Sequence, residues 1–201
     1  MTSKADIRSR LAERRQALPI DTRRWLDARI AARAEAFVRA SGRTTAMLFA
    51  PSGGEPDITA VEARVAGTCR IAYPRVRDDG QIEFRLCRAT ELSDGWRGLQ
   101  EPPVSSPLAT TGDAVAFVPA LAVSPAAGAR IGRGGGHYDR VFAANPEWIR
   151  VAVVYDFQLT DEIVAESHDE PMDGIVTPSM TYLGPTHPGS RLAPRRTGEM
   201  Q

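Results

Sequence analysis

The sequence predicts a single α/β domain over residues 1–183, a three-layer α/β/α sandwich with a mostly parallel central sheet and an N-terminal helical pair. Three observations lead to this prediction. Apolar residues recur at helical spacing up to about residue 41, and short apolar runs then alternate with helical segments. The 201-residue chain is 42% hydrophobic, which is enough for one substantial core. Residues 184–201 are rich in proline, glycine and arginine, and we expect them to form a disordered tail.

Two amphipathic helices are predicted first. Ser3 and Asp6 form a capping-box pattern, and the helix that follows is expected to continue until Pro19. A second helix, capped by Asp21, should end near Gly42 and bury one apolar face lined by Leu26, Ile30, Ala34 and Phe37. Basic residues outnumber acidic ones in this pair, so its outer surface is either a solvated face or an anion-binding surface.

Short apolar runs after residue 44 predict the strands of the sheet. Residues 77–80 are a turn signal between two of these runs and predict either a hairpin or a short excursion at the sheet edge. Residues 93–112 are expected to form a structured loop. The later strand–loop–helix–strand order predicts parallel pairing. The predicted strands are 46–50, 69–73, 82–86, 114–118, 151–155 and 174–177, and the predicted helices are 58–66 (capped by Asp57), 137–144 and 160–165.

Composition excludes several classes of partner. The chain carries 25 basic and 25 acidic side chains, so no overall charge favours nucleic acid or an acidic membrane. No apolar run approaches the length of a membrane span, and no export signal is visible, which predicts a cytoplasmic protein. Cys69 and Cys87 fit neither a disulfide framework nor a metal-ligand spacing, and we expect reduced thiols in the core.

A glycine-rich loop at residues 132–136 is the most informative stretch. Four glycines in five positions let backbone amides approach a ligand, and the loop leads into a predicted helix N-terminus, which favours an anion such as phosphate. Arg130, Arg133 and Arg140 add positive charge. The loop matches neither the P-loop nor the dinucleotide fingerprint. A merely flexible surface loop therefore remains an alternative.

Two aspartates are candidate magnesium ligands. Asp139 directly follows the glycines, where its carboxylate would repel a phosphate unless a divalent cation bridged the two groups. Asp169 lies in a polar cluster before the last predicted strand and is the second candidate. An ordinary loop or helix-capping acid is the competing interpretation of Asp169.

Residues 118–122 (VPALA) and 128–140 (GARIGRGGGHYDR) together resemble the motif of the 5-formyltetrahydrofolate cyclo-ligase family. The resemblance extends over residues 3–178. Further matching residues are Lys4, Arg8, Glu55, Pro56, Asp57, Tyr73, Pro74, Arg75, His168, Asp169 and Asp173.

The resemblance implies a role for each matching position. Glu55 and Ala50 would contact the folate, Asp139 and Asp169 would hold Mg²⁺, and Arg133 and Tyr138 would be catalytic. ATP would be bound by Lys4, Arg8, Arg130, Ile131, Gly132, Arg133, Gly134, Gly135, Gly136, His137 and Tyr138. The folate would also meet Arg133, Gly134, Gly135, Gly136 and His137.

The activity implied by the resemblance is conversion of 5-formyltetrahydrofolate to 5,10-methenyltetrahydrofolate with release of ADP and phosphate. The formyl oxygen would be phosphorylated by ATP, and N10 would then close the ring. The expected partners are these two small molecules, with no nucleic acid or membrane, in a monomer or weak homodimer. One alternative is a folate- or nucleotide-binding protein with little or no turnover. Another is an RNA-binding surface on the basic helices.

Three departures from the family pattern motivate the binding-only alternative. Gly135 stands where many relatives have lysine, which removes a phosphate-neutralising charge. His137 stands in place of the first of two tyrosines, and Val123-Ser124 in place of phenylalanine and aspartate.

Overall fold

A seven-stranded sheet forms the centre of the protein in the computed structural model, which describes residues 3–110, 112–163 and 169–183. The strand order is β11-β10-β9-β6-β1-β2-β3. The inner pairings are all parallel, and only the edge strands β3 and β11 pair antiparallel, which confirms the mostly parallel sheet. The strands are β1 (Thr45–Met47), β2 (Arg70–Val76), β3 (Ile82–Leu86), β6 (Ala114–Pro119), β9 (Ile149–Val153), β10 (Gly174–Val176) and β11 (Thr181–Leu183).

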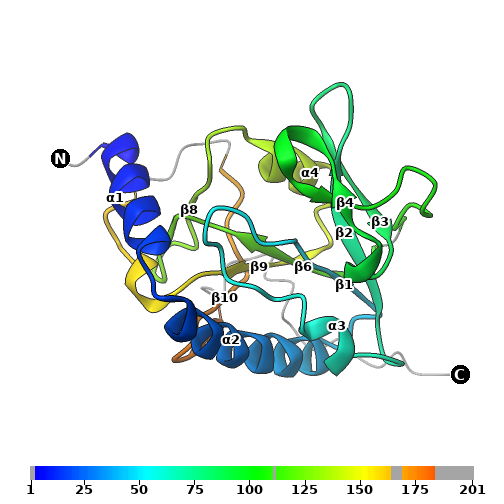
Figure 1. Ribbon diagram of the computed structural model, residues 1–201, viewed down its shortest axis with the longest axis horizontal. Helices are drawn as coiled ribbons and strands as arrows, with labels where there is room; N and C mark the ends of the chain where they lie inside the picture. Colours follow the sequence, from blue (N-terminus) through cyan, green and yellow to red (C-terminus); the bar gives the residue numbers. More distant parts are fainter. Residues whose placement is uncertain (1–2, 111, 164–168, 184–201) are drawn as a thin grey trace, which may run out of the picture.

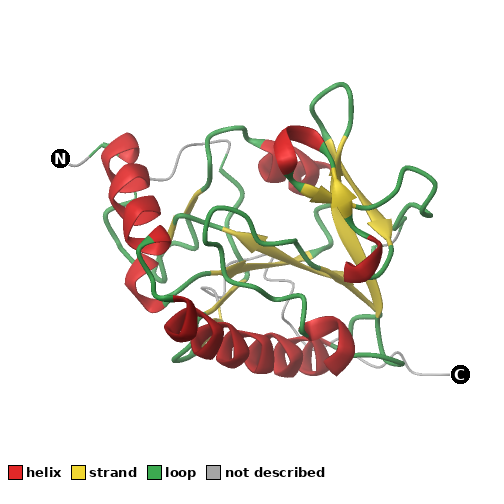
Figure 2. Ribbon diagram, viewed as in Figure 1, coloured by secondary structure: helices red, strands yellow, loops and turns green. Residues whose placement is uncertain are grey.

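Helices cover both faces of this sheet, as the three-layer prediction requires (Figures 1 and 2). On one face α2 (Ile20–Ser41) and the short α3 (Val61–Arg64) pack against the sheet, with Phe37 edge-on to Phe117. On the other face α4 (His137–Ala144) buries Phe142 beside Trp148 and the outer side chains of β6 and β9. Two apolar cores therefore sandwich the sheet.

The N-terminal helix α1 (Lys4–Gln16) lies beside the sheet and covers a small hairpin. Its capping box, Ser3 with Asp6, is formed as predicted. Ile7 and Leu11 pack against the hairpin of β7 (Ala122–Val123) and β8 (Arg130–Ile131). Because β8 leads into the glycine loop, this packing brings α1 to the loop.

Two predicted helix starts are wrong, and both have local causes. Helix α2 begins at Ile20, with Pro19 as its N-cap, because the Pro19 carbonyl accepts the Arg23 N–H at 2.9 Å and so closes the first helical turn. Asp21 therefore lies inside the first turn instead of capping it. The helix predicted over 58–66 shrinks to α3, because the Asp57 carboxylate accepts the Thr59 N–H at 2.9 Å and forms a turn.

The helix predicted over 160–165 is absent from its described part, residues 160–163. Leu159 bridges to Val123, and the Thr160 N–H donates to the Val123 carbonyl at 3.0 Å, so the chain continues the hairpin edge in extended form. Before it lies a 3-10 turn, η3 (Asp156–Gln158). Residues 164 and 165, like the tail predicted over 184–201, lie outside the described residues.

The loop predicted over residues 93–112 is structured in its described part, residues 93–110 and 112. It contains β4 (Ser93–Asp94), β5 (Gln100–Glu101) and the 3-10 turn η2 (Trp96–Gly98), and a further 3-10 turn, η1 (Ala89–Glu91), precedes it. Buried Glu101 ties it to the sheet by accepting the Val76 N–H at 3.1 Å. The hairpin of β2 and β3 is confirmed, whereas the short edge strand β11 was not predicted.

Both cysteines are free thiols, as expected, but they are only partly buried and pack against the core instead of lying within it. Among the described helices, none combines the length and apolarity that crossing a bilayer requires.

Candidate active site

The glycine loop connects β8 to the first turn of α4 and has backbone angles that favour glycine. Gly134 has a φ of +96° and Gly136 a φ of +60°, and Gly136 is the N-cap of α4. The predicted helix start at His137 is therefore correct. The loop presents the unpaired N–H groups of a helix N-terminus beside several arginines.

Arg130 lies beneath this loop with only 6% of its side chain exposed. Its Nη2 donates to the Asp139 carboxylate at 2.8 Å, and its guanidinium lies 5.6 Å from the ring centroid of Tyr138. Its Nε is buried and has no hydrogen-bond partner among the described residues. A buried cationic N–H without a partner is rare, and its position fits a site for an anionic ligand.

Helix α1 brings two more cations to the same place. The Arg8 Nε donates to the Gly132 carbonyl at 3.0 Å, and the Lys4 Nζ lies 3.4 Å from the Asp169 carboxylate. Lys4 and Arg8 are one helical turn apart, so they lie on the same face of α1. The structure therefore joins Arg8 to the glycine loop and pairs Lys4, on the same face of α1, with Asp169.

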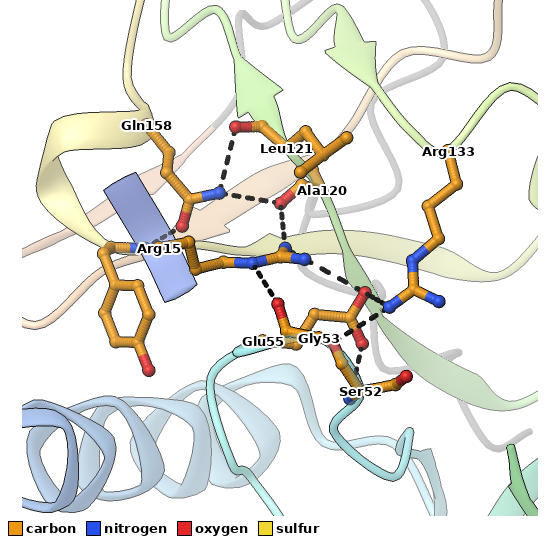
Figure 3. Close-up of polar contacts among 9 residues, drawn as sticks. Arg15, Ser52, Gly53, Glu55, Ala120, Leu121, Arg133 and Gln158 are labelled. Atoms are coloured by element: carbon orange, nitrogen blue, oxygen red, sulfur yellow. Dashed lines mark hydrogen bonds and ion pairs between the residues drawn. The ribbon is translucent and has the colours of Figure 1, made fainter. Parts of the chain in front are cut away.

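Glu55 is buried on the loop after β1, and its carboxylate is held from three sides (Figure 3). One oxygen lies 2.9 Å from Arg133 Nη2 and 4.0 Å from Arg15 Nη1. The other accepts the Ser52 N–H at 3.0 Å. Burial raises the pKa of Glu55, and the two arginines oppose this rise. Ala50 lies at the start of the same loop and is partly buried.

The electrostatic surroundings of Tyr138 keep its phenol neutral, a form that can donate a hydrogen bond but does not act as a base. Burial raises its pKa above the ordinary value, the nearby Glu55 carboxylate adds to the rise, and Arg130 and Arg133 oppose it. The phenol therefore stays protonated at neutral pH. Its ring packs 6.0 Å from that of Phe142, which orients it on α4.

His137, one of the departures from the family pattern, contacts neighbouring loops. Its Nδ1 lies 2.7 Å from the Gly80 carbonyl, and its ring meets the Trp96 ring edge-on at 5.9 Å. Ser124, another departure, donates to the Asp161 carboxylate at 2.9 Å and accepts the Ala127 N–H at 3.1 Å. Asp161 thus brings a carboxylate from a different segment to Ser124, the position where the family has an aspartate. No pattern in the sequence had indicated this role for Asp161.

The two predicted magnesium ligands are each paired with a different cation, Asp139 with Arg130 and Asp169 with Lys4. Among the described residues no three His, Cys, Asp or Glu side chains converge as a metal cluster. Both carboxylates are partly exposed, at 21% and 18%. Mg²⁺ usually takes one or two carboxylates together with phosphate oxygens and water, so the chemistry of either carboxylate fits Mg²⁺ brought in with a nucleotide.

Sequence reasoning missed two buried residues, Arg15 beside Glu55 and Gln158, which bonds to the Ala120 carbonyl that Arg15 also contacts. A signal for Arg15 was available, because it follows Ile7 and Leu11 at intervals of four residues. That spacing places an arginine on the apolar stripe of α1.

The fold is that of the solved 5,10-methenyltetrahydrofolate synthetases. The structure from Aquifex aeolicus superposes with a TM-score of 0.78 at 24% identity, covering 98% of this chain and 96% of that one. The structure from Mycoplasma pneumoniae gives 0.67 at 21% identity, with coverages of 88% and 99%.

The sequence comparisons define the family. The model of the 5-formyltetrahydrofolate cyclo-ligase family matches residues 1–178. A protein from Mycolicibacterium smegmatis named 5-formyltetrahydrofolate cyclo-ligase is 36% identical over 195 residues, covering 88% of this chain and 94% of that protein. The chain therefore belongs to the 5-formyltetrahydrofolate cyclo-ligase family, as its motifs predicted.

Proposed function

We propose that this protein converts 5-formyltetrahydrofolate and ATP into 5,10-methenyltetrahydrofolate, ADP and phosphate. Family membership and the name of the curated relative support cyclo-ligase activity. The observation that carries the proposal is the contact of Arg133 with Glu55 at 2.9 Å. Arg133 belongs to the loop expected to hold phosphates, and Glu55 is the residue expected to hold the folate. Their contact puts the two expected binding regions side by side.

The proposed reaction has two steps. The formyl oxygen attacks the γ-phosphorus of ATP, and the bond from that phosphorus to the β–γ bridging oxygen breaks to release ADP. N10 then attacks the activated formyl carbon, loses its proton as the ring closes, and phosphate leaves with the former formyl oxygen. Both steps need positioning and charge stabilisation more than a protein nucleophile.

The residues of this chain supply those effects. Arg130 and Arg133 neutralise charge on the transferred phosphoryl group, and Tyr138 donates a hydrogen bond as a neutral phenol. Lys4 and Arg8 bind the phosphates from α1, and Glu55 accepts N–H groups of the folate. Asp139 and Asp169 would hold Mg²⁺, which supplies charge neutralisation to the phosphates when bound.

The basic N-terminal helices are better explained by internal contacts than by RNA binding. Arg29 and Arg33 both donate to the Pro178 carbonyl, at 3.0 and 3.1 Å, and Arg39 donates to the Arg64 carbonyl at 2.7 Å. These side chains fasten α2 to loops of the fold. A cytoplasmic location and a monomer or weak homodimer remain predictions.

The test is the absorbance of 5,10-methenyltetrahydrofolate after mixing the protein with 5-formyltetrahydrofolate, ATP and Mg²⁺. Asp139→Asn should abolish the signal, as should omission of ATP. Asp113→Asn is the matched control, because Asp113 also pairs with an arginine, Arg43, at 3.3 Å but lies at the start of β6. Circular dichroism should show all variants folded.

Silence from the folded wild-type protein would overturn the proposed turnover. Tight binding of 5-formyltetrahydrofolate without ADP release would then support the binding-only alternative. That result would direct attention to Ser124, Gly135 and His137.

A further inference from the structure

Arg15 is a buried charge on the apolar face of α1. It continues the stripe of Ile7 and Leu11, and only 3% of the residue is exposed. A buried guanidinium is costly unless its donors and its charge are compensated. Its partners therefore indicate what this arginine holds in place.

The partners of Arg15 come from two other segments (Figure 3). Its Nε donates to the Gly53 carbonyl at 3.0 Å, and its Nη1 reaches the Ala120 carbonyl at 3.5 Å. The same Nη1 lies 4.0 Å from the Glu55 carboxylate. Arg15 thus connects α1 and the end of β6 to the loop that carries Glu55.

The loop is fitted closely around Arg15. Gly54 has a φ of +77°, and a Cβ atom at this position would lie 3.2 Å from the Arg15 carbonyl oxygen. The Ala120 carbonyl that Arg15 contacts is also held in place. Fully buried Gln158 donates to the carbonyls of Ala120 and Leu121 at 2.9 Å each, and its side-chain oxygen accepts the Tyr155 N–H. Arg15 therefore has little freedom to move.

Arg133 contacts the same carboxylate in a different setting. Its side chain is 49% exposed and extends from the glycine loop, whereas that of Arg15 is 4% exposed. It also donates to the Ser52 carbonyl at 2.9 Å. Of the two arginines facing Glu55, Arg133 can turn to a ligand at small cost, and Arg15 cannot.

We propose that Arg15 is a positioning residue: it fixes the 52–55 loop and stays the counter-ion of Glu55 when Arg133 turns to the anion of a bound ligand. This inference rests on the proposed function, in which Glu55 accepts hydrogen bonds from the folate. It assigns different tasks to two arginines that share one carboxylate. Arg15 itself touches neither substrate.

The charges around this pair set the expected pH dependence. Glu55 faces Arg15 of α1 and Arg133 of the glycine loop, and Tyr138 of α4 is also coupled to it. Arg15 in turn faces Arg23 of α2 and Tyr155 after β9. Burial already favours a neutral Glu55. Removing Arg15 raises the Glu55 pKa further, so a smaller fraction of Glu55 is ionised at acidic pH.

The experiment compares Arg15→Gln, Arg15→Lys and the control Arg10→Gln. Arg10 lies on the same helix, but its side chain is 59% exposed and pairs only loosely with Glu162, at 3.8 Å. The KM for 5-formyltetrahydrofolate, the KM for ATP and kcat are measured at a series of pH values from the acidic to the weakly alkaline side of neutrality.

Arg15→Gln should raise the folate KM about tenfold or more at neutral pH, because a charged hydrogen-bond network is lost. The acidic limb of its pH profile for kcat/KM with 5-formyltetrahydrofolate should move to higher pH. The KM for ATP should stay near the wild-type value. Arg15→Lys keeps the charge, so its acidic limb should stay in place. Arg10→Gln should match the wild type throughout.

A readout independent of turnover separates this inference from the proposed function. The Glu55 pKa is measured by NMR with ¹³C-labelled glutamate, and Glu55→Gln assigns the signal. A higher Glu55 pKa in Arg15→Gln supports the inference even if the wild type shows no turnover. A folded Arg15→Gln protein that loses only thermal stability, with its Glu55 pKa and acidic limb unchanged, overturns it.

Arg133→Gln provides a second test if Arg15→Gln does not fold. Arg133 is half exposed on a loop, so its replacement should leave the fold intact. Arg15 is then the remaining cation beside Glu55, and Glu55 should still be ionised at pH 7. A neutral Glu55 at pH 7 in this variant would show that Arg15 does not serve as its counter-ion.

Discussion

The imidazole of His137 lies against Gly135, so that a Cβ atom on Gly135 would be 2.6 Å from the Cδ2 atom of His137. The same imidazole holds its position through the 2.7 Å contact between Nδ1 and the Gly80 carbonyl. A side chain at position 135 must therefore displace His137. Two departures from the family pattern, Gly135 in place of lysine and His137 in place of tyrosine, are thus physically coupled.

This coupling predicts that restoring the family lysine alone is harmful. Gly135→Lys should lower kcat/KM for ATP several-fold, because the displaced His137 disturbs the loop. The double variant Gly135→Lys, His137→Tyr should recover most of that loss, with a coupling energy of about 1 kcal/mol or more. The single variant His137→Tyr completes the cycle. Strictly additive effects on kcat/KM would contradict this prediction.

Lys4 should contribute to ATP binding and little to stability. Lys4→Gln is expected to raise the KM for ATP about tenfold, through loss of a charged contact to phosphate. Its ion pair with Asp169 is partly exposed, so the free energy of unfolding should change by no more than about 1 kcal/mol. Steady-state kinetics and urea denaturation measure the two effects. An ATP KM equal to that of Arg10→Gln would refute the assignment.

Gly128 should be important for stability. Its φ is +67°, and a Cβ atom there would lie 2.8 Å from the Met172 carbonyl oxygen. Gly128→Ala should therefore destabilise the fold by about 2 kcal/mol or more, from backbone strain and a backbone clash together. Gly67→Ala is the matched control, because Gly67 has a φ of +79° but open space around it. Equal losses in urea denaturation would mean that the Met172 contact is unimportant.

The Asp27–Tyr155 pair predicts a pH dependence of stability. The Tyr155 hydroxyl donates to the Asp27 carboxylate at 2.8 Å, yet burial raises the pKa of Asp27 above its ordinary value. Folding therefore favours protonated Asp27. The resulting stabilisation is full below the unfolded-state pKa and is lost as the pH rises through the folded-state pKa.

The measurement for this pair is the free energy of unfolding of the wild type relative to Asp27→Asn. Asparagine does not titrate. The wild type should therefore lose free energy of unfolding relative to Asp27→Asn as the pH rises from about 4 through the folded-state pKa of Asp27. A difference that stays constant over this range would show that the Asp27 pKa is not raised.

Regular local patterns made most elements predictable. The capping box at Ser3, the helix over residues 137–144 and the β2–β3 hairpin are encoded by neighbouring residues, so they could be read directly. The errors fall where a single contact decides the outcome. Asp57 formed a turn with Thr59 in place of a helix cap, and Thr160 bonded to Val123 in place of starting a helix.

The candidate site was predictable as a set of residue types and not as a set of contacts. The motifs indicated Lys4, Arg8, the glycine loop and Glu55, and the structure joins Arg8 to Gly132 and Arg133 to Glu55. Arg15 and Gln158 were missed because their importance comes from buried contacts, Arg15 with Glu55 and Gln158 with the Ala120 carbonyl. Neither lies in a recognisable motif.

The sequence by itself determined the fold class, the family and the chemical inventory of the site. Hydrophobic periodicity and a glycine-rich motif are local properties, and they persist whatever the rest of the chain does. Only the tertiary structure decided which arginine is buried and which is exposed beside Glu55. Burial depends on segments more than a hundred residues apart, because α1 meets both the end of β6 and the glycine loop. That packing gives Arg15 and Arg133 different environments, although the two side chains are chemically identical.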